Sequence, residues 1–383
     1  MKIAYCIDTI TALGGIERVT IAKANALADV NNNTIYLFVT SNHGTPILPV
    51  NPKIKIIDLQ VNYYEDYGKS RFQAYQILYK KRKEHKKKLT LVINEIQPDI
   101  LISTNQSEKH FIKSLSIPKH IVIIREIHFC TNYRKLEAKN SFQRLLAHIG
   151  HFFDFHWDTK RIDQIVLLTN EDKELHWKGN NKVSVIPNPI IYQSPYPPST
   201  TKEKRVIAEG RLVYQKNFAS LINAWKQVAN KHPDWILEIY GEGGLKLELE
   251  SLIAKLNLKK HVFLRGRTTD IFKVMSNSSL FVLSSIYEGL PLVILKAMSC
   301  GLPIVSYTCP CGPKDIITEG KDGFLVKVND ENALADKINN LIENKDLRQQ
   351  MSDTAKNKAK QYNIDNITSI WMNLFTFIKS SNQ

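Results

Sequence analysis

Residues 284–305 read Ser-Ser-Ile-Tyr-Glu-Gly-Leu-Pro-Leu-Val-Ile-Leu-Lys-Ala-Met-Ser-Cys-Gly-Leu-Pro-Ile-Val. The apolar run 280–284 leads into the Glu-Gly turn of this stretch, and a second β-branched run, 303–307, ends it. Between the two runs lies a helical stretch that stops at Gly301, and glycine commonly follows the end of a helix. A strand, a helix and a second strand in this order form a parallel βαβ unit, so the segment predicts an α/β fold.

The alternation of strands and helices extends along the chain in two series of short β-branched runs. The first series contains the runs 3–7, 35–39, 100–103, 120–124, 164–168 and 183–186, and the second contains 205–208, 235–240, 262–264, 280–284, 303–307 and 324–326. Helical patterns separate the runs, as in doubly wound α/β folds. We therefore expect two Rossmann-like domains, each with a parallel sheet, facing a cleft.

The domain borders follow from composition. Residues 1–190 contain the first series, and residues 205–362 contain the second. The segment 191–204 between them is rich in Pro, Ser and Thr and has no apolar period, which predicts a linker. Residues 363–383 form a last helix, expected to pack back across the domain junction through the apolar side chains Ile367, Ile370, Trp371, Leu374, Phe375 and Ile378.

Composition and charge limit the class of protein. The 383 residues are 43% apolar and 23% charged, enough for two domains with substantial cores, and the formal net charge is +15. Such a charge attracts anions, which leaves nucleic acid, an acidic lipid surface and phosphorylated substrates open. Asp8 interrupts the first apolar run too early for a signal peptide, and no run approaches the roughly 18 residues of a spanning helix. We expect a cytoplasmic protein that is not integral to a membrane.

The cysteines predict reduced thiols. Their number, five, is odd, and they are far apart except for Cys309 and Cys311. Reduced thiols in the cytosol explain this pattern most simply. The Cys-Pro-Cys step has no second Cys or His pair at the spacing of metal ligands, so we expect a tight turn there and no metal site.

Two glycine-containing turns follow predicted strands and could bind anions. In the first, Gly14 and Gly15 precede a helix, whose exposed amides favour anions, although many such turns are only turns. In the second, Gly210 and Arg211 are followed by Lys216. A guanidinium and an ammonium at a strand end suit a diphosphate, and the alternative is a solvated basic loop.

Three further segments follow strands of the second series. The loop Gly241-Glu242-Gly243-Gly244 could approach a base or ribose, and Arg267 with Thr268 follows the next strand. Glu288 stands at the start of a helix, where a carboxylate lines the expected cleft. Its alternative role is to complement the helix dipole, worth up to roughly 1 kcal/mol.

The order of these motifs resembles family-4 retaining glycosyltransferases (glycosyl transferases group 1) with the GT-B fold. The likeness is greatest to the branch that builds bacterial surface polysaccharides and lipid-linked oligosaccharides. The family's Gly-Gly-x-Glu-Arg resembles residues 14–18, its Gly-Arg-Leu with a following Lys-Asn resembles residues 210–217, and its Glu-Gly-Leu-Pro resembles residues 288–291. Each motif alone is weak, but their joint order is specific and spans nearly the whole chain.

The resemblance implies a role for each matched residue. Arg211 and Lys216 would bind the donor diphosphate, and Glu288 would contact the transferred sugar. His128, in a segment similar to the family's His-bearing segment after a strand, would lie beside that sugar, whereas a histidine satisfied in the fold is the alternative. The remaining donor-binding residues would be Gly14, Gly15, Gly241, Glu242, Gly243, Arg267, Thr268, Gly289, Leu290, Leu292 and Lys296.

Lys296 departs from the family pattern. The family has a second Glu eight positions after the first, and it binds the donor ribose hydroxyls, whereas this chain has Lys296 there. A cation has replaced a hydrogen-bond acceptor. The change could weaken ribose recognition, redirect the ammonium to a phosphate or mark a loss of activity, and we expect retained activity because the other donor motifs are intact.

The implied function is transfer of a hexose or N-acetylhexosamine from a nucleotide diphosphate sugar, by preference a UDP-sugar, without metal or other cofactor. The acceptor would be a lipid-linked or polysaccharide intermediate held by the first domain. The basic run 80–88, preceded by Phe72, Tyr75, Leu78 and Tyr79, would contact anionic lipid, or is only a solvated helix face. Two other functions stay open: a nucleotide-sugar epimerase on the same scaffold, and a catalytically impaired scaffold or basic nucleic-acid-binding protein, which the absence of nucleic-acid-binding motifs disfavours.

Overall fold

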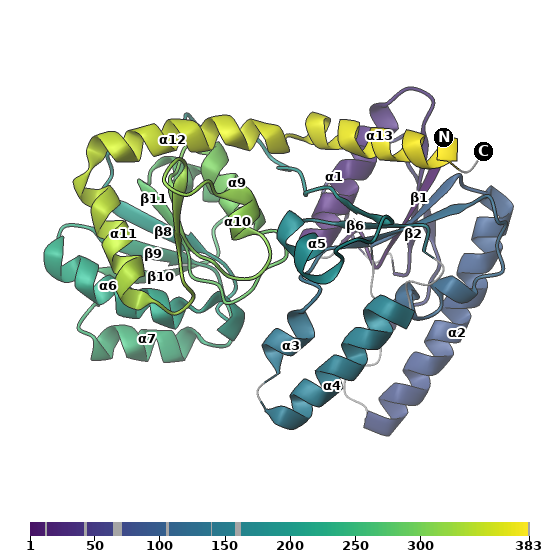
Figure 1. The fold of residues 1–383 in the computed structure, drawn as a ribbon, viewed down its shortest axis with the longest axis horizontal. Coiled ribbons are helices and arrows are strands. Elements are labelled where there is room, and N and C mark those ends of the chain that lie inside the picture. Colours follow the sequence, from purple (N-terminus) through teal and green to yellow (C-terminus); the bar gives the residue numbers. More distant parts are fainter. Residues whose placement is uncertain are drawn as a thin grey trace. The chain divides into compact units, whose positions relative to one another are not determined.

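The computed structural model describes the whole chain except residues 12–13, 42–43, 64–70, 105–106, 139, 158–161 and 382–383. It divides into two compact units (Figure 1). Unit 1 comprises Met1–Leu168, Lys173–Ile191 and Ile364–Gln383, and unit 2 comprises Thr169–Asp172 and Tyr192–Asn363. Both are parallel α/β structures, as the alternating sequence pattern predicts.

Unit 1 contains a seven-stranded parallel sheet. Its strands are β1 (Lys2–Ile7), β2 (Thr34–Val39), β3 (Lys55–Asp58), β4 (Ile100–Ser103), β5 (Val122–Ile127), β6 (Gln164–Leu167) and β7 (Val183–Val185). The strand order is β3-β2-β1-β4-β5-β6-β7, so the order reverses between β1 and β4. Loops that leave neighbouring strands in opposite directions open a crevice at such a point, which places the residues after β1 and β4 beside it.

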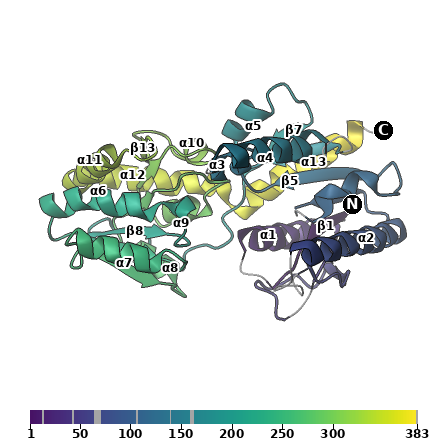
Figure 2. The same ribbon diagram turned by 90° about the horizontal axis from the view of Figure 1, so that it is seen from below.

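Helices cover both faces of the unit 1 sheet (Figure 2). On one face, α1 (Gly15–Asp29) and α13 (Ile364–Ser381) share a core with the strands, in which Trp371 and Phe375 are fully buried. On the other face, α2 (Arg71–Ile96) contributes Leu89 and Ile93 to a second core. The remaining elements are η2 (Glu108–His110), η3 (Ile112–Ser114), α3 (Tyr133–Glu137), α4 (Ser141–Phe152), the π-helix η4 (Phe153–Trp157) and α5 (Asn170–His176). The C-terminal helix therefore returns to the N-terminal unit, as predicted.

Unit 2 contains a six-stranded parallel sheet of order β10-β9-β8-β11-β12-β13. Its strands are β8 (Arg205–Glu209), β9 (Ile236–Tyr240), β10 (Val262–Gly266), β11 (Leu280–Leu283), β12 (Ile304–Tyr307) and β13 (Gly323–Val326). Its helices are η5 (Tyr214–Lys216), α6 (Phe218–Lys231), α7 (Lys246–Lys255), α8 (Ile271–Ser276), α9 (Leu292–Ser299), α10 (Pro313–Ile316), α11 (Glu331–Glu343), α12 (Lys345–Ala359) and η6 (Lys360–Tyr362). The order reverses between β8 and β11, whose following loops carry the strongest sequence motifs.

Three local details differ from the sequence-based expectations or add to them. Strand β3 was not expected, because its residues are mostly polar or half-exposed. Strand β5 extends to Ile127, so Arg125 and Glu126 lie within a strand and not after one. The segment expected as a linker has no helix or strand, yet Ser199 and Thr201 are buried, and the Ser199 amide donates to the Cys300 carbonyl at 2.8 Å.

Candidate active site

The loops after β8 and β9 pass each other so closely that glycine is required. Gly241 has φ +140°, and a Cβ built there would lie 1.9 Å from the carbonyl oxygen of Gly210. A Cβ on Gly243 would lie 2.4 Å from the carbonyl oxygen of Leu212. These glycines therefore fix where the loop that carries Arg211 and Lys216 stands at the end of the sheet.

Lys216 and Glu288 meet across the β8–β11 switch point of unit 2. The Lys216 Nζ donates to Glu288 Oε1 at 2.5 Å, and Ser285 Oγ donates to the same oxygen at 2.6 Å. Ser284 Oγ donates to the Lys216 carbonyl at 2.8 Å, which ties the two loops together a second time. Glu288 is 7% exposed, so its carboxylate is oriented by fixed partners and not by water.

Arg211 is exposed, and it makes no ion pair or hydrogen bond through its side chain with any residue that the structure describes. Its guanidinium follows β8 directly, five residues before Lys216. A planar guanidinium that is not already paired can donate hydrogen bonds to a phosphate without first breaking a contact within the protein. Lys216 and Arg211 thus differ, because one cation is already held in place and the other is open.

The amides at the start of α9 complete this end of unit 2. Gly289 and Leu290 form the turn before the helix, which begins at Leu292, and the first amides of a helix lack partners within it. The turn after β12 packs against it, because a Cβ on Gly312 would lie 3.1 Å from the Gly289 carbonyl oxygen. Cys309 and Cys311 belong to that turn and are buried.

Two more ion pairs join the loops of unit 2. Lys296 Nζ donates to both carboxylate oxygens of Glu209, at 2.7 and 2.8 Å, so its ammonium is held at the end of β8. Arg267 Nε lies 3.0 Å from Glu242 Oε2, with both side chains more than half exposed. Thr268 stands one residue later and accepts the Asp270 amide at 3.1 Å.

In unit 1, His128 lies directly after β5 in a buried, charged cluster. Its Nε2 is 3.4 Å from Glu126 Oε1, its side chain is 2% exposed, and its Nδ1 has no hydrogen-bond partner among the described residues. Lys23 donates to the same Glu126 oxygen. Burial opposes ionisation of Glu126, but Lys23 and His128 outweigh it and lower the carboxyl pKa to about 2.

The C-terminal helix supports this cluster. The Nζ of Lys23 lies 4.9 Å from the centroid of the Trp371 ring on α13, within the range of a cation–π contact. Trp371 therefore covers the ammonium that orients Glu126. Helix α13 thus adds more than apolar core to unit 1, because it closes the charged cluster beside His128.

Gly14 and Gly15 lie at the start of α1, where Gly14 is the extended residue before the helix. A Cβ on Gly14 would lie 1.9 Å from Glu17 Oε2, so the missing side chain makes room for this carboxylate. Glu17 is half-buried, and burial together with the neighbouring Asp8 raises its pKa. These glycines therefore position an acidic side chain.

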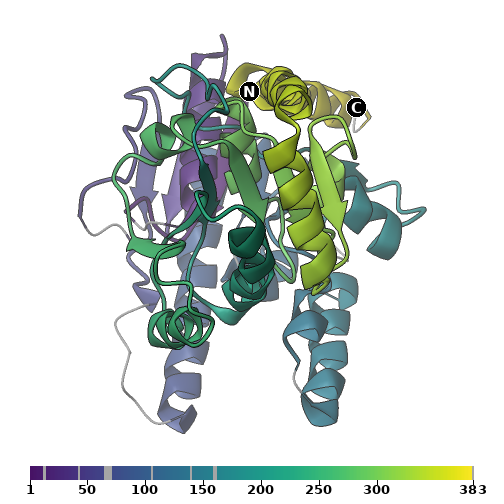
Figure 3. The same ribbon diagram turned by 90° about the vertical axis from the view of Figure 1, so that its left-hand side faces the viewer.

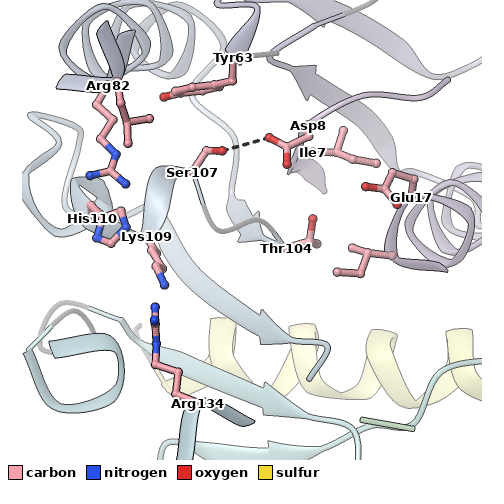
Figure 4. A pocket seen from close by; sticks show the side chains of 12 residues that line it. Ile7, Asp8, Glu17, Tyr63, Arg82, Thr104, Ser107, Lys109, His110 and Arg134 are labelled. Carbon is pink, nitrogen blue, oxygen red and sulfur yellow. Dashed lines mark hydrogen bonds between the residues drawn. The ribbon is translucent and has the colours of Figure 1, made fainter. Parts of the chain in front are cut away.

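A pocket of about 510 Å³ opens beside Glu17 in unit 1 (Figure 4). Its polar lining comes from Asp8, Glu17, Tyr63, Arg82, Thr104, Ser107, Lys109, His110 and Arg134. Asp8 follows β1 and Thr104 follows β4, the two strands at the switch point. The strand-end rule could have found these two residues, whereas Arg82 stood out only as part of the basic run 80–88 and no sequence signal indicated Arg134.

The site residues predicted from the sequence therefore fall into two groups. Unit 2 holds Arg211, Lys216, Gly241, Glu242, Gly243, Arg267, Thr268, Glu288, Gly289, Leu290, Leu292 and Lys296, all in loops after strands of its sheet or on α9. Unit 1 holds Gly14, Gly15 and His128, close to the ends of β1 and β5. Each group gathers at the carboxyl end of its own parallel sheet, where α/β folds bind ligands.

Comparison with known proteins shows which proteins this chain resembles. Residues 194–358 match the family model of glycosyl transferases group 1. An uncharacterized glycosyltransferase of Haemophilus influenzae is 29% identical over 97% of this chain and 98% of its own length. The chain is a glycosyltransferase, and its residues 194–358 are similar to the group 1 family.

Further relatives and solved structures agree with this assignment. A Campylobacter jejuni N-acetyl-D-galactosaminyltransferase that acts on a PP-undecaprenol-linked acceptor is 26% identical over the full length of both chains. The structure of TarM is similar at a TM-score of 0.78, 17% identity and 98% coverage of both chains. The galactosyltransferase WaaB gives a TM-score of 0.72, 19% identity, and coverage of 99% of this chain and 100% of its own. The fold of this glycosyltransferase is GT-B.

Proposed function

We propose that this glycosyltransferase moves a hexose or N-acetylhexosamine from a UDP-sugar to a lipid-linked or polysaccharide acceptor in bacterial surface glycan synthesis. The observation that carries the donor part is the pair of cations, Arg211 and Lys216, at the switch point of unit 2, beside the fixed carboxylate of Glu288. The names of relatives support the acceptor part, since one acts on a PP-undecaprenol-linked sugar and another on an α-D-GlcNAc-diphosphoundecaprenol. Their glycosyltransferase names also favour transfer over epimerisation.

The proposed reaction retains the anomeric configuration and needs no metal. The bond from the sugar C1 to the diphosphate oxygen breaks, and the acceptor oxygen forms the new bond to C1 from the same face. The acceptor proton goes to a phosphate oxygen of the leaving diphosphate. Arg211, Lys216 and the amides at the start of α9 stabilise the negative charge that grows on the diphosphate, so they act most strongly in the transition state.

Glu288 and His128 are assigned to the transferred sugar. Both hydrogen bonds that the described residues make to the Glu288 side chain go to Oε1, which leaves Oε2 to accept from a sugar hydroxyl. His128 has a buried Nδ1 without a described partner, so a ligand hydroxyl would satisfy it. We assign no enzymic nucleophile, because the proposed transfer is direct.

Contact with an anionic membrane is the second part of the proposal. The structure shows no helix, among the residues described, that is long and apolar enough to span a bilayer. Helix α4 and the start of η4 instead expose six large apolar side chains, each 48 to 68% exposed: Phe142, Leu145, Leu146, Ile149, Phe152 and Phe153. Their spacing places them on one stripe, and residues 141–153 contain no acidic side chain.

The basic helix α2 extends from unit 1 toward the same side as α4 (Figures 1 and 3). Lys80, Lys83 and Lys87 are exposed on it. An apolar stripe and a basic helix that extend toward the same side of unit 1 suit a bilayer with acidic headgroups better than they suit water, because the stripe buries apolar area and the lysines meet negative charge.

Two experiments test these proposals. Calorimetry with UDP-sugars in EDTA, followed by NMR of the product anomer, should show binding and retention, whereas a requirement for Mg²⁺ or an inverted product would overturn the mechanism. For the membrane, the variant Leu145→Ser/Ile149→Ser should sediment at least tenfold less with phosphatidylglycerol vesicles than the control Leu247→Ser, which changes a leucine 79% exposed on α7 of unit 2. Equal sedimentation of the two variants would show that α4 does not take part in the membrane contact.

A further inference from the structure

The pocket of unit 1 has two walls of opposite charge (Figure 4). Arg82, Lys109, His110 and Arg134 lie along one side, and Asp8 and Glu17 lie at the other. The basic side chains come from α2, η2 and α3, and the acidic ones from the end of β1 and the start of α1. A volume of about 510 Å³ falls in the range of small-ligand sites.

Asp154 pairs with two cations of the basic wall. Lys109 Nζ donates to Asp154 Oδ1 at 2.9 Å, and Arg134 Nε donates to Asp154 Oδ2 at 2.8 Å. Both carboxylate oxygens are thereby used, and one negative charge is shared by two positive ones. The wall keeps a net positive charge after this internal compensation, and Arg134 is still 38% exposed.

Arg82 has no such compensation. No described residue pairs with it or accepts a hydrogen bond from its side chain, and its Nε is buried. Buried donors are satisfied in folded proteins as a rule, and a guanidinium presents a fork that matches two oxygens of one phosphate. Arg82 lines the pocket together with Leu78, one turn earlier on α2, and its guanidinium lies on the same side as His110 and Lys109 (Figure 4).

The acidic end of the pocket is built differently. Ser107 Oγ donates to Asp8 Oδ1 at 3.1 Å, which fixes the carboxylate beside the pocket. Burial and Asp8 raise the pKa of Glu17. Carboxylates at this end repel an anion and accept hydrogen bonds from hydroxyl groups, so a ligand with a sugar and a phosphate has only one favourable direction.

We infer that this pocket binds an acceptor that carries a phosphate, with the phosphate against Arg82 and Arg134 and a sugar hydroxyl toward Asp8 and Glu17. The inference rests on the proposed function, because it names the chemistry of the acceptor at that function's second substrate site. Phosphate of this kind occurs in the diphosphate of a prenyl-linked sugar and in the phosphodiester of a soluble polymer. The membrane surface proposed for α2 and α4 favours the prenyl source.

The test measures binding to the full chain with saturating UDP present, so that the donor diphosphate site of unit 2 is filled. Calorimetry measures the binding of three probes: citronellyl diphosphate, citronellol and glycerol 3-phosphate. The variant Arg82→Gln is compared with Arg82→Lys and with the matched control Lys83→Gln, which removes the same charge from an exposed neighbour on the same helix. Thermal unfolding of each variant shows whether the fold is kept.

The expected result is that citronellyl diphosphate binds the unaltered protein at least tenfold more tightly than citronellol does. Arg82→Gln should lose at least tenfold in affinity for the diphosphate, Arg82→Lys less, and Lys83→Gln at most twofold. Stronger binding of citronellyl diphosphate than of glycerol 3-phosphate indicates the prenyl source, and the reverse indicates a soluble polymer.

Unchanged affinity in Arg82→Gln, or an equal loss in Lys83→Gln, would overturn the inference, because the phosphate would then bind elsewhere or only through general charge. Failure of the proposed function has a different signature. In that case UDP itself would not bind, while the Arg82-dependent affinity for the diphosphate could still be measured.

Discussion

The two units place their candidate sites at the same topological position but build them from different elements. In unit 2 the charged side chains lie in loops after the strands and on α9. There Lys216 pairs with Glu288, Lys296 pairs with Glu209, and Arg211 has no partner among the described residues. In unit 1 the pocket keeps Arg82 without a partner among the described residues, opposite two carboxylates. The site formed by loops after strands, in which Glu288 already holds Lys216, suits one constant group, the diphosphate of the donor. The site with cations from separate helices, opposite two carboxylates, suits a group that differs between relatives, the acceptor.

The largest expected effect concerns the unit 2 cations. Arg211→Ala/Lys216→Ala should lower transfer at least a thousandfold, because both changes remove charge stabilisation of the leaving diphosphate, and one such donor is worth roughly 3 to 4 kcal/mol. Lys216→Ala also leaves the buried Glu288 carboxylate without its cation, so we expect a lower unfolding midpoint for that variant. Steady-state kinetics and thermal unfolding measure the two effects. Lys226→Ala on α6, an exposed lysine, is the control and should change neither.

The second effect separates the units kinetically. Arg82→Gln should raise KM for the acceptor about 10- to 100-fold, as expected for loss of a charge-assisted hydrogen bond worth roughly 1.5 to 3 kcal/mol, while KM for the donor stays within twofold. Initial rates with each substrate varied at saturation of the other give both constants. A rise in the donor KM alone would assign Arg82 to the donor and erase the contrast between the units.

Substitution in the Lys296–Glu209 pair should have a smaller effect on UDP affinity, and a second substitution should reverse that effect. Lys296→Glu places a carboxylate against Glu209 in place of the ammonium that now holds both of its oxygens, so UDP affinity should fall about tenfold through repulsion and a disordered loop. The exchange Glu209→Lys/Lys296→Glu restores an opposite pair and should recover most of that loss. Calorimetry with UDP tests this. If the exchange variant binds no better than the single variant, the pair does not position the loop.

The last effect acts on stability and not on activity, and it is a pH dependence of unit 1. Burial lowers the pKa of His85, on α2 beside Tyr63 of the pocket, from its ordinary 6.5 to about 4. The unfolded chain therefore takes up this proton first, so the stability due to neutral His85 is complete above pH 6.5 and is lost as pH falls toward 4, by about 3 kcal/mol. Urea unfolding between pH 7.5 and 4.5 should show a smaller drop in His85→Gln than in the control His120→Gln, an exposed histidine. Equal drops would place the pH dependence elsewhere.

The sequence predicts much of the fold because a parallel sheet leaves a periodic record in the chain. The run 100–103 was expected as a strand and forms β4 with those bounds. Strand β3 left no such record, since it lies at the sheet edge with little buried apolar surface. The apolar stripe of the last helix, α13, correctly predicted that this helix packs against the first domain.

The two candidate sites also differ in how far the sequence predicts them. The residues predicted for unit 2 stand within short motifs, and their roles stay predictions that the variants above test. Arg82 on α2 and Arg134 on α3 are 52 residues apart in sequence but line the same pocket. No local sequence pattern predicts this wall, because it depends on where the two helices lie in space. The basic run that drew attention as a membrane surface contains Arg82 itself, whose role as a pocket residue needed the structure.

The central claim is that unit 2 recognises two linked phosphates through Arg211 and Lys216. The most direct measurement is the ratio of affinities for UDP and uridine, taken by calorimetry in the unaltered protein and in Arg211→Ala/Lys216→Ala. We predict a ratio of about 100 or more in the unaltered protein and a ratio near one in the variant, because only the diphosphate distinguishes the two ligands. An unchanged ratio would contradict the claim.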